Sequence, residues 1–224
     1  MKVVIKDSHI NLDNVDYFAY DSIAVATIGA YGEKRTFEPN PSKHGLNKKG
    51  ELTSAAFQDR PKIISSHGPY EYAIDNSVNG GFGGAFKADL KVATIDGHVG
   101  IDAFAGRQDA LRFMCFFVDP DPMATVINNA GKKNHIKDLG GDARVVHRVI
   151  IAIDDKLAKY LGGDATYDVK AGAGPIEIEV TIDAKANTKT TLSFSDPTCI
   201  GYLLMKVKWN NDRVVETEDD VWSL

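Results

Sequence analysis

Apolar and polar residues alternate along much of this chain, a pattern typical of β-strands with one buried face. In the segment PIEIEVTID, isoleucine or valine occupies every second position from Ile176 to Ile182, and acidic or hydroxyl residues stand between them. A weaker alternating segment, KTTLSFSD, follows after the polar residues AKANTK. We therefore expect a β-hairpin over residues 175–195, with one face exposed to solvent.

Three other segments are more continuously apolar: RFMCFFVD, RVVHRVIIAID and CIGYLLMKVKW. Such runs indicate central strands that are covered on both faces. Their inward residues, among them Phe113, Val149 and Leu203, are expected in the core. The strands predicted from both patterns cover residues 2–6, 22–29, 85–95, 98–104, 112–118, 144–153, 166–170, 176–183, 190–194 and 199–209.

The pair Asp96-Gly97 separates two alternating runs and predicts a two-residue turn between strands. The glycines of the preceding segment GGFGGAF lead into a strand, whereas phosphate-binding glycine loops open a helix, so we interpret them as a bend. Short helices are expected over residues 50–58 and 154–164. The predicted fold class is therefore mainly β, an antiparallel β-sandwich or jelly-roll-like domain with long loops and one or two short helices.

Two segments do not have the pattern of a core. Residues 31–62 are poor in aliphatic residues and contain three prolines, so we predict a long basic loop insertion within a single β-rich domain spanning residues 1–211. Residues 212–224 are predicted as an acidic C-terminal tail with an apolar end. The residues of these two segments that we expect to make interactions are Lys43, His44, Lys48, Lys49, Glu216, Asp219, Asp220, Trp222 and Leu224.

Composition narrows the functional classes only a little. The 224 residues are 43% hydrophobic and 25% charged, which is ordinary for a folded domain, and the net charge of −5 gives no overall case for binding nucleic acid. No apolar run reaches the length of a membrane-spanning helix, and Lys6 and Asp7 interrupt the N-terminal segment before a classical signal peptide can form. We expect the protein in the cytoplasm or in an assembled particle.

No arrangement of residues in the sequence indicates a catalytic or metal site. Cys115 and Cys199 lie in apolar runs and are interpreted as buried free thiols. His147 lies among valines and is interpreted as a core or interface histidine. Aspartates near strand ends could bind calcium if their loops converged, but turns and helix caps explain each of them locally. No cofactor or metal is predicted, and an enzymatic function is not favoured.

The sequence thus favours a structural or self-assembling protein, such as a virion or phage-tail subunit, that forms homo-oligomers through its basic loop and acidic tail. One alternative is a carbohydrate- or receptor-binding module that uses aromatic residues: Tyr70, Tyr72, Phe82 and Tyr167. Further alternatives are a pore-forming toxin, suggested by the amphipathic hairpin, and a hydrolase with loop aspartates beside His135 or His67.

Overall fold

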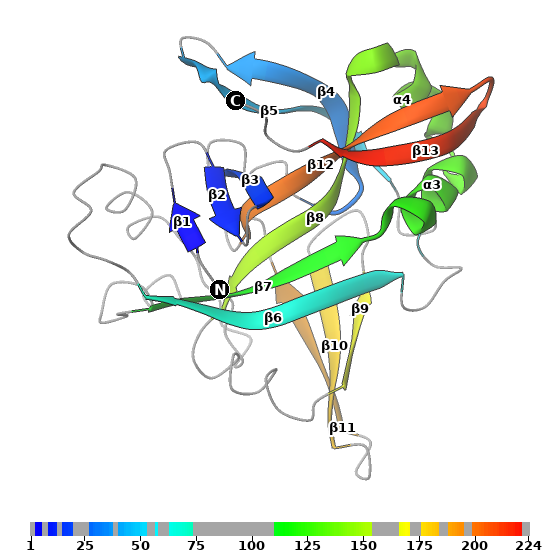
Figure 1. Cartoon of the computed structure of the whole chain (residues 1–224). Helices are drawn as coiled ribbons and strands as arrows, with labels where there is room; N and C mark the ends of the chain where they lie inside the picture. Colours follow the sequence, from blue (N-terminus) through cyan, green and yellow to red (C-terminus); the bar gives the residue numbers. More distant parts are fainter. Residues whose placement is uncertain are drawn as a thin grey trace.

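A computed structural model shows a mainly β protein with antiparallel strands and two short helices (Figure 1). It describes residues 3–5, 9–12, 15–19, 27–37, 40–52, 57, 63–73, 110–153, 166–170, 176–183, 188–194 and 199–220. The strands of the larger sheet are β1 (Val3–Ile5), β2 (His9–Leu12), β3 (Val15–Ala19), β4 (Ala30–Phe37), β5 (Asn40–Glu51), β6 (Ile64–Ala73), β7 (Ala110–Val118), β8 (Ala143–Ile153), β12 (Cys199–Asn210) and β13 (Arg213–Asp220). A second sheet contains β9 (Thr166–Lys170), β10 (Ile176–Asp183) and β11 (Thr188–Phe194), and the helices are α3 (Pro120–Asn129) and α4 (Lys133–Asp138).

Strands β8 and β12 form the centre of the ten-stranded sheet and pair with each other. Each of them has two successive partners along its other edge. The start of β8 pairs with β4 and its later part with β7, while the start of β12 pairs with β3 and its later part with β13. The sheet therefore branches on both sides of the central pair.

A β-bulge at His147 marks the branch on β8. Leu203 pairs with Arg148 and Leu204 pairs with Val146, so His147 has no partner residue on β12. The bulge falls between the part of β8 that pairs with β4 and the part that pairs with β7. Because a bulge bends its strand and increases the local twist, it allows one strand to direct two neighbours along different paths.

Both faces of the central strands are buried, which confirms the prediction from the continuous apolar runs. Phe116, Val149, Ile150 and Leu203 are each fully buried. The helix α3 adds Met123, Val126 and Ile127 to the core, at the spacing of one helix face. The hairpin formed by β10 and β11 is also confirmed, with Ile178 paired to Leu192.

Two of the expectations about non-core segments were wrong. Residues 30–37 and 40–51 form the paired strands β4 and β5 rather than a loop, and residues 213–220 form the edge strand β13 rather than a tail. Strands in a ribbon or at a sheet edge need few aliphatic residues, because much of their surface faces solvent. That residues 1–211 form one domain stays a prediction.

Both described helices were missed. The sequence pattern predicted no helix directly after residue 118, yet Asp119 precedes α3 and Pro120 opens it. Proline suits the start of a helix because it lacks the backbone N–H. The helix expected over residues 154–164 and the strands expected over 85–95 and 98–104 lie outside the described residues. Of the strand expected over 22–29, only residues 27–29 are described, and they form a turn.

The close contact between β4 and β5 at Gly32 gives a test of the fold. A Cβ atom at Gly32 would lie 2.1 Å from the backbone oxygen of Asn47, so Gly32→Ala must separate the two strands. We expect the free energy of unfolding to fall by about 1–3 kcal/mol, as for other overpacked sites, measured by urea denaturation. The control is Gly131→Ala, where nothing lies within 4 Å of the added atom. Equal losses in the two variants would contradict the assigned register.

Candidate functional site

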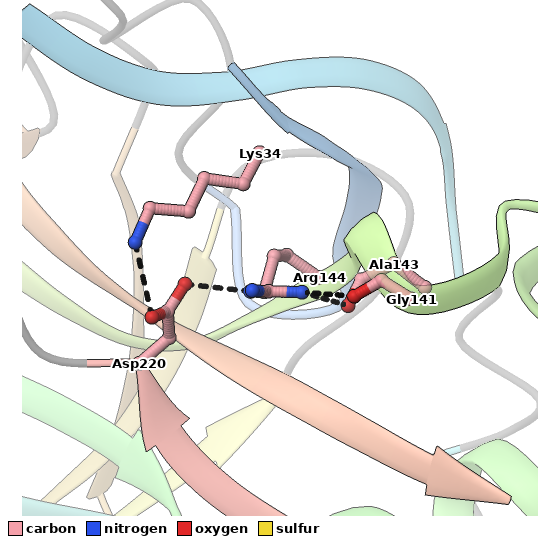
Figure 2. Close-up of polar contacts among 5 residues, drawn as sticks. All are labelled: Lys34, Gly141, Ala143, Arg144 and Asp220. Atoms are coloured by element: carbon pink, nitrogen blue, oxygen red, sulfur yellow. Dashed lines mark hydrogen bonds and ion pairs between the residues drawn. The ribbon is translucent and has the colours of Figure 1, made fainter. Parts of the chain in front are cut away.

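The two segments in which the sequence predicted interaction residues meet within one chain. Asp220, at the end of β13, lies between Lys34 of β4 and Arg144 of β8 (Figure 2). Its Oδ1 is 3.1 Å from Lys34 Nζ, and its Oδ2 accepts a hydrogen bond of 2.6 Å from Arg144 Nε. Arg144 also donates to the backbone oxygens of Gly141 and Ala143. We call these contacts the Asp220 junction.

The Asp220 junction is largely shielded from solvent. The exposed fractions of the Asp220 and Arg144 side chains are 15% and 10%. A guanidinium in this setting needs a counter-charge, because an uncompensated buried charge is costly. The junction therefore fastens the end of β13 to β8 and to Lys34, which directly follows the part of β4 that pairs with β8.

The other described acidic residues of this segment also have partners within the chain. Lys208 Nζ lies 3.2 Å from Glu216 and 2.8 Å from Glu218, and the hydrogen bond to Lys208 lowers the pKa of Glu218. Asp212 pairs with Lys137, which lowers the pKa of the Asp212 carboxyl. Much of the acidic charge that was expected to reach a neighbouring subunit is thus paired with cations of the same chain, whereas Asp219 lies beside the neutral ring of His147.

The predicted basic residues divide into two groups. Lys48 pairs with Glu51, and Lys49 Nζ lies 3.1 Å from Glu33. Lys43 and His44 lie nearer the start of β5, where His44 is paired with Thr36 of β4. Trp222 and Leu224 lie outside the described residues.

The outer part of the β4–β5 hairpin extends beyond the sheet. Strand β4 pairs with β8 only from Tyr31 to Glu33, whereas its pairing with β5 continues to Phe37 and Asn40. Figure 1 shows the two strands reaching away from β8 toward the upper left. We call residues 35–37 and 40–45 the hairpin arm. No other described strand pairs with either edge of it.

The base of the hairpin arm is held in the core. Leu46 is 2% exposed, and its backbone N–H donates to the hydroxyl of Tyr202 at 3.3 Å. Tyr202 is fully buried on β12 and stacks on Phe18, with ring centroids 5.5 Å apart. The arm is therefore a two-stranded ribbon with a fixed base.

His147 is a buried titratable group that lies beside Asp219 of β13. Its side chain is 1% exposed, and its Nδ1 lies 3.3 Å from the oxygen of Val118. Val118 O is an acceptor, so Nδ1 carries the proton in the neutral ring. Nε2 lies 3.2 Å from Asp219 Oδ1 but is not directed for a hydrogen bond. Burial lowers the pKa of His147 to about 4, against the opposing effect of Asp219.

Where the structure describes their side chains, the residues of the alternative functions contact neighbouring side chains. The hydroxyl of the buried Tyr31 is 2.9 Å from His135 Nδ1, and the ring of His67 stacks on Phe117 at 4.8 Å. Tyr70 packs on Phe113. Tyr72 and Tyr167 are described only as strand positions in β6 and β9, and Phe82 lies outside the described residues.

Both cysteines are free and buried, as predicted, and burial raises the pKa of Cys115 to about 11, so it is a poor nucleophile at neutral pH. Within the described ranges, no three His, Cys, Asp or Glu side chains lie close enough together to hold a metal ion. None of the helices described is long and apolar enough to cross a membrane.

No family model, curated protein or solved structure matches the chain. The function therefore has to be argued from the contacts described above.

The Asp220 junction predicts a loss of stability when its carboxylate is removed. Asp220→Asn leaves Arg144 and Lys34 without a counter-charge, so we expect the free energy of unfolding to fall by about 2 kcal/mol, less than for a fully buried pair. Urea denaturation measures the change. The control is Glu216→Gln, which removes an acidic side chain that is 59% exposed and should change stability by less than about 0.5 kcal/mol. Similar small effects in both variants would show that the junction contributes little.

The burial of His147 predicts an acid-sensitive fold. Because its pKa is about 4 in the folded chain and about 6.5 when unfolded, the unfolded state takes up the proton first as the pH falls. This group should therefore remove about 3 kcal/mol of stability between pH 6.5 and pH 4. Urea denaturation across this range should show a shallower pH dependence for His147→Gln than for the parent. His67→Gln, at an exposed position of β6, is the control, and identical slopes for the parent and His147→Gln would contradict the assignment.

Proposed function

We propose that the protein is a structural subunit that self-associates, and that the hairpin arm makes the contact between copies. The observation that carries this proposal is the ribbon itself. Two-stranded ribbons are marginally stable in water, and an unpaired strand edge is a template for pairing with another chain. A projecting arm of this kind is stabilised when a second copy covers it.

The other long edges of the large sheet are less suited to such pairing. Val214 of β13 is paired through its N–H and C=O to the side chain of Asn128, at 2.9 and 3.0 Å. Strand β6 is interrupted by a bulge between His67 and Tyr70, where Gly68 has a positive φ and Pro69 lacks an N–H. These features favour the hairpin arm as the place of contact.

The ion pairs within the chain change which interactions we expect at the contact between copies. The sequence suggested basic and acidic segments that attract each other between subunits, but Glu216, Glu218 and Asp220 of β13 pair with cations of their own chain. We therefore propose a contact made mainly by backbone hydrogen bonds along the arm, with Lys43 and His44 setting its charge. A sandwich or jelly-roll arrangement, a role in a virion, phage tail or similar particle, and a cytoplasmic or particle location remain parts of this proposal.

The test is a shortened arm. Lys34 and Leu46 are paired residues, so joining them through Asn-Gly in place of residues 35–45 closes the hairpin with a two-residue turn and keeps its base. We expect the parent to form a defined oligomer in size-exclusion chromatography with light scattering, and the shortened variant to be a monomer that still unfolds cooperatively on heating. The midpoint of thermal unfolding should rise with protein concentration for the parent and not for the variant.

Two further variants complete the experiment. Asn211→Gly alters the β12–β13 turn at a residue with positive φ, which glycine accepts, so it should assemble like the parent. A chain ending at Asp220 tests whether Trp222 and Leu224 contribute, without removing β13. A monomeric parent at high concentration, or an oligomer of unchanged size after arm shortening, would rule out the proposed contact.

A further inference from the structure

A groove lies at the end of β13 that is remote from the Asp220 junction. It has a volume of about 570 Å³ and is formed by the last residues of α3, the first residue of α4 and the turn between β12 and β13. Most of its wall consists of three exposed asparagines, two cationic side chains and one exposed valine. Its lining residues are Asn128, Asn129, Lys133, Asn210, Asn211, Asp212, Arg213 and Val215.

The charges in the groove do not balance. Asp212 pairs with Lys137, outside the wall, and Lys137 is the main cause of the lowered pKa of Asp212. Lys133 and Arg213 have no ion-pair or hydrogen-bond partner for their side chains among the described residues. The groove is therefore locally positive in a chain whose net charge is −5.

The wall also offers unused hydrogen-bond donors. Asn128 is fully engaged with Val214, but the side chains of Asn129, Asn210 and Asn211 make no hydrogen bond to any described residue. Each carries an amide NH₂ with two donors. The two bonds between Asn128 and Val214 fix α3 against β13, so the two sides of the groove are held in place before any ligand arrives.

We propose that this groove binds an oxyanion, the phosphate or sulfate group of a ligand. Two cations and several amide donors match a group that carries negative charge and accepts hydrogen bonds. The wall contains no aromatic ring, so it lacks a stacking surface for a neutral sugar or a nucleobase. Binding here does not depend on the hairpin arm or on self-association.

The test compares three probes: inorganic phosphate, a fluorescein-labelled oligothymidylate and a fluorescein-labelled heparin octasaccharide. Calorimetry measures the first, and fluorescence polarisation measures the other two. The groove variant is Lys133→Gln/Arg213→Gln. The control variant, Lys49→Gln/Lys208→Gln, removes the same charge from two cations that are paired elsewhere on the surface.

We expect saturable binding of at least one probe, weakened about tenfold or more in the groove variant and about twofold or less in the control. Binding of only the oligonucleotide identifies a phosphate source, binding of only heparin identifies a sulfate source, and phosphate competition against both supports the shared oxyanion chemistry. The absence of saturable binding for all three probes, or an equal loss in both variants, would overturn the proposal. The chain with a shortened arm should bind like the parent, which separates this result from that of the assembly experiment.

Discussion

Strands β8 and β12 are hydrogen-bonded to each other, and every other strand of the large sheet is reached through one of them. Both strands are buried on both faces, so their apolar surface holds the branches together. The constraint on this arrangement is that one strand must pair with two neighbours in succession. The bulge at His147 provides the bend, and the buried imidazole ring contacts the last carbonyl of β7 where that strand leaves the ladder.

The charge distribution follows from this branching. Strand β13 lies along β12, and β4 lies along β8, so the end of β13 reaches the side of the central pair where Lys34 and Arg144 project. Asp220 therefore pairs with two cations of its own chain. Acidic and basic segments that are distant in sequence are thus partners within the chain, and the proposed assembly depends on the open edges of the hairpin arm rather than on charge attraction between copies.

Period-two alternation and continuous apolar runs were sufficient to place β7, β8, β10, β11 and β12, because those strands bury one or both faces and the burial is visible in the residue pattern. The same pattern could not find β4 and β5. Their segment contains Gly45, Gly50 and several lysines, and its strand character comes from pairing rather than from apolar side chains. For the site, the sequence singled out Asp219 and Asp220 for contacts between subunits, which stays a prediction. Their neighbours within the chain, from β4 and β8, could not be predicted because they depend on long-range topology. Nothing in the sequence around Lys133 and Arg213 indicated a binding site, because the groove forms only where α3, α4 and the β12–β13 turn meet in the folded chain.

The position of α3 connects the proposed contact to the fold. Asn128 bonds both backbone groups of Val214, as a neighbouring strand would, and the hydroxyl of Thr217 donates to the oxygen of Pro120 at the other end of the helix. The helix thereby closes the outer edge of β13, the kind of edge that otherwise invites uncontrolled pairing. With that edge closed, and β6 interrupted by its bulge, the proposed pairing between copies would be directed to the hairpin arm. Because pairing at a single projecting ribbon limits the number of ways two copies can meet, the closed edges favour a defined assembly over irregular aggregation.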